Sequence, residues 1–309
     1  MWVVLAFISA LCLGFYDISK KVALRDNSVV DVLTASILIS SGILVIPLLL
    51  SRIMPELMSG TLFYVPTLDL QGHLLTILKS AIVLSSWICA YVALKHLPIS
   101  IVSPWQATRP MWTLIGALLI FGERLNSWQW IGVILAIGSI FVFSFFSRPA
   151  GHAKELLHTP ETKYYIALAM AILIGACSGL YDKYIMSLYD HNAVQVYYTL
   201  YQAVMMVTFC YIHHRRHHTR PALRAGRDLR SLIAIPLISI FLVISDNVYM
   251  LALQDPDSMI AVVSTIRRGG TVIGFGYGLL FLREKDPWKK FLCMIGILTG
   301  LICLAVGTM

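Results

Sequence analysis

Long apolar segments alternate along the chain with short polar ones. Ten of them approach the roughly 20 apolar residues that an α-helix needs to cross a bilayer. These segments are residues 2–22, 30–50, 74–94, 99–121, 127–146, 163–188, 194–213, 231–253, 258–282 and 289–308. Runs such as ILVIPLLL lack the apolar–polar alternation of membrane β-strands. The pattern therefore predicts an all-α, polytopic membrane protein with ten transmembrane helices.

Composition agrees with a membrane protein. Hydrophobic residues make up 58% of the 309 residues and charged residues only 13%, whereas soluble domains have about 25% charged residues. The apolar N-terminus lacks the basic region of a secretory signal, so we expect it to be an uncleaved first span. The six cysteines all fall in predicted spans without a CxxC pair, which indicates neither disulfides nor a zinc site. No cofactor is expected.

Positive charge is distributed unevenly between the predicted loops. Most Lys and Arg residues follow odd-numbered spans, and only Arg52 and Arg124 flank the other loops. We expect the protein to lie in the inner (plasma) membrane of the cell. The positive-inside rule then places the basic loop 213–230 in the cytoplasm and both termini on the extracytoplasmic side. The His- and Arg-rich stretch 213–227 could bind a metal or anionic lipid headgroups, but a solvated cytoplasmic loop is the simpler interpretation. No nucleic acid is needed to explain the basic pI.

The chain resembles itself at two places. GFYDISKKVAL (14–24) is similar to SGLYDKYIMSL (178–188), and LLIFGERLNSW (118–128) to LLFLREKDPW (279–288). Because each copy holds five spans, the second must cross the membrane in the opposite sense. We therefore predict a first repeat at 1–147, a linker at 148–162 and a second, inverted repeat at 163–309. Inverted repeats are typical of carriers that work by alternating access.

A known family shares these features. A Gly-Glu-Arg turn (Gly122, Glu123, Arg124) closes span four, and a Trp and a Gly-rich fifth span follow in WQWIGVILAIG (128–138). This pattern resembles the EamA-type transporters of the drug/metabolite transporter superfamily. The resemblance implies a carrier of small metabolites such as amino acids, drugs, nucleotide sugars or phosphorylated sugars. The second copy departs from it at Arg283, which replaces the glycine. Many members are described with cytoplasmic termini, opposite to the charge bias here.

Arginines lie deep inside two predicted spans. A charge at that depth costs about 2.5–3.5 kcal/mol on insertion scales, so each is a candidate for function. Arg109 lies midway along span four, and Arg267 and Arg268 lie midway along span nine. These spans are equivalent in the two repeats, so inversion brings the arginines towards one centre. Their planar fork of donors suits carboxylate or phosphate. Arg268 points about 100° from Arg267 around the helix, which leaves one of the two with a structural role.

Acidic, polar and aromatic neighbours complete the predicted substrate site. The candidates are Arg109, Arg267, Arg268, Gln106, Asp17, Asp182, Asp246, Tyr16, Tyr181 and Trp105. The structural alternative is that aspartates pair with the arginines to join helices, and that the aromatic residues pack. For Asp17 and Asp182 both interpretations stay open, while Arg109 and Arg267 favour a substrate site.

The leading functional hypothesis is a secondary transporter of a small organic anion or zwitterion, such as an amino acid or a phosphorylated metabolite. One alternative is an exporter of cationic or aromatic drugs that uses Asp17 and Asp182. Another is a lipid or lipid-headgroup flippase. The sequence contains no HExxH, GxSxG or GxxxxGK[ST] motif, so neither an enzyme nor an ATP-driven pump is expected. The expected partners are a small-molecule substrate and membrane lipids, with the chain as a monomer or homodimer.

Overall fold

In the computed structural model the described part of the chain consists of helices and their connections. The described residues are 1–23, 27–97, 102, 105–106, 108–146, 162–216, 229–270, 272–273 and 287–308. The helices are α1 (Trp2–Ala23), α2 (Val29–Ile53), α3 (Pro55–Met58), α4 (Leu70–His96), α6 (Arg109–Ile120), α7 (Ser127–Phe146), α8 (Thr162–Met186), α9 (His191–Arg216), α10 (Leu229–Gln254), α11 (Ile260–Arg268) and α13 (Pro287–Thr308). The predicted all-α class is confirmed. Almost the whole predicted linker, most of the basic loop, Arg283 and Glu284 lie outside the described residues.

The predicted membrane spans are confirmed in part. Among the described residues, six helices are long and apolar enough to cross a bilayer. They contain Trp2–Lys20, Val30–Ile53, Leu70–Ala90, Thr162–Met186, Ile233–Gln254 and Phe291–Thr308. Two shorter apolar helices lie at Arg109–Ile120 and Ser127–Phe143. The chain is a multi-pass membrane protein, while the number of ten spans, their division into repeats and the orientation remain predictions.

Helix α9 is long, yet it is not among those six spans. Its residues Gln195, Thr199 and Gln202 recur at helical spacing and are all buried. The Gln195 amide donates to the carbonyl of Val243 on α10 at 2.7 Å, and the Thr199 hydroxyl donates to the carbonyl of Gln195 at 2.8 Å. Polar side chains that form hydrogen bonds inside a bundle lower the mean hydropathy of their helix, although they do not face the lipid. The amide content of α9 therefore reflects an inward polar face.

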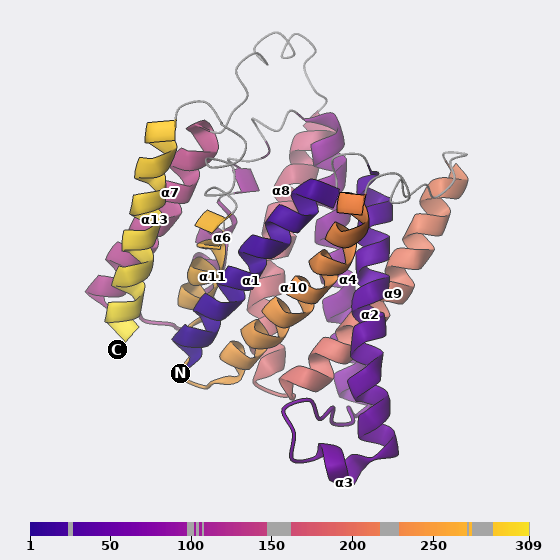
Figure 1. Ribbon diagram of the computed structural model, residues 1–309. Helices are drawn as coiled ribbons and strands as arrows, with labels where there is room; N and C mark the ends of the chain where they lie inside the picture. The colour runs from indigo at the N-terminus through magenta and orange to yellow at the C-terminus, as the bar shows by residue number, and fades with distance from the viewer. Residues whose placement is uncertain are drawn as a thin grey trace.

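The helices pack in pairs that join distant parts of the sequence. Helix α1 lies along α10, α4 along α8, α2 beside α9, and α7 beside α13 (Figure 1). Helix α6 contacts α8 and α11, and α11 also contacts α1. The N- and C-termini lie at the same end of the bundle (Figure 1).

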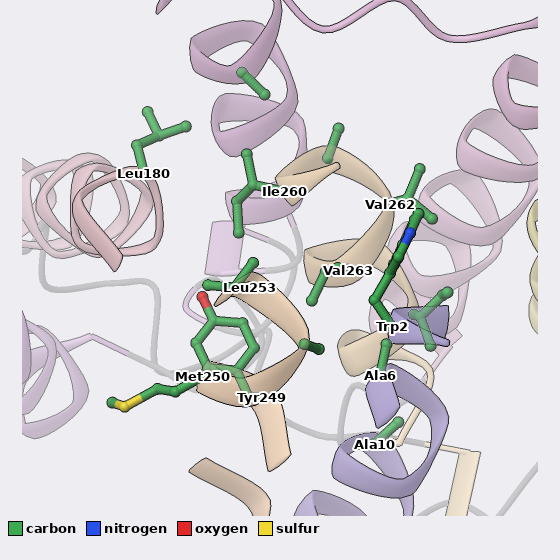
Figure 2. Close-up of a cluster of buried hydrophobic side chains, with 14 of the residues drawn as sticks. Trp2, Ala6, Ala10, Leu180, Tyr249, Met250, Leu253, Ile260, Val262 and Val263 are labelled. Atoms are coloured by element: carbon green, nitrogen blue, oxygen red, sulfur yellow. The ribbon is translucent and has the colours of Figure 1, made fainter. Parts of the chain in front are cut away.

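The short helix α11 lies in the largest apolar cluster. Its residues Ile260, Val262 and Val263 are fully buried. Figure 2 shows them among side chains of α1, α8 and α10: Trp2, Ala6, Ala10, Leu180, Tyr249 and Leu253. Because other helices surround α11, the charged residues of its last turn lie inside the protein rather than against lipid.

Glycines allow close approach at the contact between α1 and α11. A Cβ atom added at Gly14 would lie 2.6 Å from the carbonyl oxygen of Gly270 and 2.7 Å from the side chain of Ile273. Small residues are typical of membrane helices whose backbones approach closely. Gly14 thus positions α1 against the C-terminal end of α11.

A buried cluster of charges as the candidate functional site

An ion pair joins α4 to α8 inside the bundle. The Lys79 ammonium group donates to the carboxylate of Asp182. Their side chains are only 3% and 11% exposed. The Lys79 ammonium group also lies 4.6 Å from the centre of the Tyr198 ring on α9. Buried charges of this kind require partners, because each charge loses its hydration. Asp182 is therefore engaged by a protein cation.

A second ion pair joins α10 to α11. The Arg267 guanidinium donates through Nη2 to the carboxylate of Asp246. Its central carbon lies 4.1 Å from the centre of the Tyr249 ring, which is within the range of a cation–π contact. The buried Nε atom of Arg267 has no hydrogen-bond partner among the described residues. Arg267 thus keeps one donor that the described protein groups do not use.

Tyr249 connects the two ion pairs. Its hydroxyl donates to Asp182 at 3.3 Å, while its ring lies against Arg267. The side chain is buried between these charges. Four helices, α4, α8, α10 and α11, therefore contribute to one continuous set of contacts, which we call the charge cluster: Lys79, Asp182, Asp246, Tyr249 and Arg267.

Arg109 lies next to the charge cluster but is held differently. It is the first residue of α6, and Pro110 follows it in the first turn, where proline is tolerated. Its Nη2 donates to the carbonyl of Gly175 on α8 at 2.5 Å. A Cβ atom at Gly175 would lie 2.6 Å from the guanidinium carbon, so only glycine leaves room for this contact. Among the described residues, no carboxylate forms an ion pair with Arg109.

Asp17 and Arg268 lie on the α1 side of α11. Arg268 is the last residue of α11, and its charge acts on Asp17 together with those of Lys20 and Arg267. Asp17 is partly buried. Arg109 also lies within electrostatic range of Arg267 and Arg268. The structure therefore brings the three predicted arginines and the three predicted aspartates into one electrostatic neighbourhood.

The remaining predicted site residues lie apart from the charge cluster. Tyr16 is buried in an apolar cluster with residues of α2 and α10. The Tyr181 hydroxyl donates to the carbonyl of Leu75 on α4 at 3.0 Å. Trp105 is 45% exposed, and Gln106 is partly buried and makes no hydrogen bond to another described residue. These four positions remain predictions that rest on the sequence.

Two residues of the charge cluster, Lys79 and Tyr249, are not among the site residues that the sequence predicts. Lys79 lies in LLTILKSAIVL, an apolar run within a predicted span. The rule that drew attention to the arginines, a charge at membrane depth, applies equally to this lysine. Tyr198 and Tyr249 carried no comparable signal, because tyrosines are common in the spans.

A second polar site, around Glu123, lies at one end of the bundle. The Glu123 carboxylate accepts from the backbone N–H groups of Ile260 at 2.6 Å and Ala261 at 3.1 Å, in the first turn of α11. Burial raises the pKa of the Glu123 carboxyl, although the two backbone N–H groups lower it. The Gly122 that precedes it has a φ of 63°, a left-handed conformation that glycine adopts without strain. The Gly-Glu turn therefore serves as a cap for α11.

Lys183 completes this end of the bundle. Its ammonium group donates to the Ser258 hydroxyl at 2.6 Å and to the carbonyl of Asp255 at 3.2 Å, just beyond α10. A cavity of about 560 Å³ lies beside it, between the α8–α9 and α10–α11 connections, and is also lined by Asp190. Burial raises the pKa of Asp190, but its hydrogen bonds with His191 and nearby backbone N–H groups lower it overall. This end of the bundle thus carries both signs of charge around an open cavity.

Comparison with known proteins supports the resemblance to EamA-type transporters. Residues 1–145 match the EamA-like transporter family. The expected EamA-type resemblance is confirmed for this half of the chain. The family is one of transporters, which agrees with a transport role. No curated protein matches the chain.

Solved structures share the fold of this chain. Twenty-eight of their chains match it. One, named only "Crystal structure of protein", has a TM-score of 0.73 and 14% sequence identity. The match covers 99% of this chain and 96% of the other. At this identity the similarity concerns the fold alone.

Proposed function

We propose that this protein is a secondary transporter that moves a small organic anion or zwitterion across the membrane by alternating access. An amino acid or a phosphorylated metabolite fits this description. The observation that carries the proposal is an excess of cations over carboxylates among the described buried and partly buried side chains around α11. Inside the bundle the described cations are Lys20, Lys79, Arg109, Arg267 and Arg268, and the described carboxylates are Asp17, Asp182 and Asp246.

Two donors are directed to a substrate in this proposal. Arg109 has a carbonyl rather than a carboxylate as its described partner, and Arg267 has an unused Nε. Arg109 also begins α6, where the helix dipole adds positive potential. A carboxylate or phosphate placed between α6 and α11 would compensate these charges with bidentate hydrogen bonds.

Alternating access rests on two inverted repeats, and the pattern of helix contacts supports them. If α1 corresponds to α8 and α4 to α10, then the α1–α10 pair and the α4–α8 pair are equivalent. The α2–α10 and α4–α9 contacts are equivalent in the same way. A two-fold relation between halves produces such reciprocal pairs, whereas an unrelated packing would not.

Buried serines support the same relation at the level of single hydrogen bonds. Ser80 of α4 donates to the carbonyl of Tyr198 on α9, and Ser239 of α10 donates to that of Ser36 on α2. Six residues further along each helix, two more serines repeat the pattern. Ser86 donates to the carbonyl of Ala171 on α8, and Ser245 to that of Ser9 on α1.

The two ion pairs weigh against a cation exporter. Asp182 and Asp246, the carboxylates that a cationic drug would need, already have Lys79 and Arg267 as partners. A cationic substrate would have to displace a protein cation from a buried pair. An anion, or the carboxylate of a zwitterion, needs no such exchange.

Ligand binding and uptake test this proposal. The purified protein is screened for thermal stabilisation by amino acids, sugar phosphates and quaternary amines, and the stabilising compound is then followed into proteoliposomes. We expect an anion or zwitterion to stabilise the protein. Charged hydrogen bonds contribute about 1.5–3 kcal/mol, so Arg109→Gln should weaken binding roughly tenfold or more. Arg267→Lys, which keeps the charge near Asp246, should weaken it less.

The matched control is Arg216→Gln, at an exposed position at the end of α9, which should leave binding and uptake unchanged. Stabilisation by quaternary amines that is lost in Asp182→Asn would contradict the proposal in favour of drug export. Transbilayer movement of a fluorescent phospholipid in these proteoliposomes, with no response to soluble anions, would instead favour a flippase.

A further inference from the structure

Three metal-ligating side chains meet where the first turn of α2 lies beside the last turns of α9. Asp31 comes from α2, and Cys210 and His214 come from α9. Cys210 and His214 are four residues apart, so they share one face of the helix. The carboxylate oxygen, the sulfur and the ring nitrogen all lie within 4.8 Å of one another. We infer that these residues form a binding site for a divalent cation of the zinc class.

The distances suit a tetrahedral ion after small side-chain movements. Zinc bonds of about 2.0–2.3 Å place ligand atoms roughly 3.3–3.7 Å apart. Nε2 of His214 and Oδ1 of Asp31 are 2.8 Å apart, slightly closer than this, and the sulfur of Cys210 lies within 4.8 Å of both. A cation that takes the place of the proton between Nε2 and Oδ1 would separate these two atoms and draw the sulfur inward.

Burial and charge also fit a cation. Asp31 is only 5% exposed and Cys210 only 8%. The surrounding cluster is apolar and includes Val30, Ala203 and Met206. One carboxylate and one thiolate balance the two charges of the ion, so the occupied site is neutral in a low-dielectric environment. A thiolate with an imidazole prefers Zn²⁺ or Co²⁺ to Mg²⁺ or Ca²⁺.

His214 is the partly exposed member of the group and lies near the end of α9. Three protein ligands and one exchangeable position are typical of open zinc sites. The His213 ring lies 5.6 Å from that of His214, and the next residues, Arg215 and Arg216, are exposed. A water molecule as the fourth ligand would therefore approach from the His214 side of the group.

An ordinary ion pair between Asp31 and His214 would explain two of these residues. It does not account for the buried thiol of Cys210 at the same place. A cation held by all three would tie α2 to α9, and so join the two proposed repeats. This inference depends on the geometry of α2 and α9 and not on the proposed transport function.

Cobalt binding tests the site in the full-length protein. Purified protein in detergent is freed of metal with EDTA and titrated with Co²⁺, whose bond to a thiolate gives a charge-transfer absorption. We expect one equivalent to bind with this absorption, and Cys210→Ser to abolish it. Asp31→Asn and His214→Gln should weaken binding beyond the roughly 10–100-fold that the loss of outer-shell partners causes.

Two controls separate this site from other thiols and histidines. Cys293→Ser, a buried cysteine on α13, should keep the absorption. The double variant His217→Gln/His218→Gln, at positions outside the described residues, should also keep it. Absorption that survives Cys210→Ser, or that disappears in the double variant alone, would overturn the inference, as would an absence of Co²⁺ binding.

Wild-type protein gives a further test that does not depend on the folding of a variant. Alkylation of each cysteine is measured by peptide mass spectrometry with and without Zn²⁺. Zinc should slow the reaction at Cys210 and leave Cys177, an exposed cysteine, unchanged. Equal rates at Cys210 in both conditions would show that its sulfur is not a ligand.

Discussion

The α4–α8 and α1–α10 interfaces occupy equivalent places in the proposed repeats, but their charges differ. Lys79 precedes Ser80 on α4 and pairs with Asp182. At the corresponding place on α10, Ile238 precedes Ser239. Ile238 is buried in an apolar cluster that also contains Tyr16. At these corresponding positions, the α4–α8 interface therefore contains an ion pair and the α1–α10 interface contains apolar side chains.

The helix packing and the buried charges therefore follow different patterns in the two proposed repeats. Serine-to-carbonyl hydrogen bonds at both interfaces follow the proposed two-fold relation between helices. The ion pairs that involve Lys79 and Asp246 depart from it, because Ile238 and Trp87 stand at the corresponding positions. In the proposed transporter, the repeats would supply two equivalent arrangements, and the unequal charges would give a polar substrate one orientation.

The largest expected effect comes from breaking the buried pair. Lys79→Met leaves the Asp182 carboxylate buried without its cation, and the removal of one partner of such a pair costs about 3–5 kcal/mol of folding free energy. The double variant Lys79→Met/Asp182→Asn should recover most of this loss. The measurement is unfolding in detergent by heat or denaturant. Asp17→Asn, on α1 at the position that corresponds to Asp182 in the repeated sequence, is the matched control and should cost less. Equal losses in Lys79→Met and Asp17→Asn would contradict the comparison.

Two glycines at corresponding positions of the proposed repeats differ in how closely neighbouring helices approach them. Gly14 of α1 corresponds to Gly179 of α8 in the repeated Gly-x-Tyr-Asp sequence. A Cβ atom at Gly14 would meet the backbone of Gly270 at 2.6 Å, whereas one at Gly179 would meet only Thr113 at 3.8 Å. Overpacking of this kind costs about 1–3 kcal/mol.

We therefore expect Gly14→Ala to lower the unfolding temperature clearly and Gly179→Ala to leave it nearly unchanged. Thermal unfolding of the two variants side by side provides the check. A similar decrease in both would mean that the α1–α11 contact is no tighter than the α6–α8 contact.

Smaller effects are expected at the serines of the proposed two-fold relation. Ser86→Ala removes one hydrogen bond between helices, and Ser245→Ala removes the corresponding one together with a contact to the Ser9 hydroxyl at 3.1 Å. Double-mutant cycles in membrane proteins value one such hydrogen bond at about 0.6 kcal/mol, so both variants should lose unfolding free energy and Ser245→Ala should lose at least as much as Ser86→Ala. A loss in only one of them would count against the reciprocal pairing of α1–α10 with α4–α8.

The hydropathy of the sequence was sufficient for the fold class and for several helices. The predicted span 2–22 corresponds to α1 (Trp2–Ala23), and 289–308 to α13 (Pro287–Thr308). Segment 194–213 lies in α9, but its polar inner face keeps it from qualifying as an apolar span. A hydropathy pattern records how many polar residues a helix has and does not record whether neighbouring helices satisfy them.

The candidate site was predictable in its residue types and not in its partners. Charge at membrane depth identified Arg267 and Asp246 separately, but their ion pair depends on how α10 and α11 cross. The same is true of Asp31 and Cys210, which lie far apart in the sequence and meet only through the α2–α9 contact. Such pairs form only when the helices pack in the tertiary structure, so they cannot be predicted from a single sequence.

An effect of similar size, visible mainly in its pH dependence, concerns the Glu123 cap at the start of α11. Glu123 accepts from two backbone N–H groups at the start of α11, and its pKa is raised above its ordinary value, chiefly by burial. The folded protein therefore binds this proton more tightly than the unfolded chain does. Stability from this group is fully present below the unfolded pKa and decreases as pH rises through the folded pKa.

Glu123→Gln keeps an acceptor for the N–H groups and removes the titration. Its unfolding temperature should therefore lose this decrease between mildly acidic and neutral pH. The charge–dipole interaction that is lost is worth at most about 1 kcal/mol. Thermal unfolding at several pH values measures both effects, with Glu56→Gln in the short helix α3 as the control. If the two-fold relation extends to the caps, Glu284→Gln will change the pH profile in the same direction, and an unchanged profile would limit the symmetry to the helices.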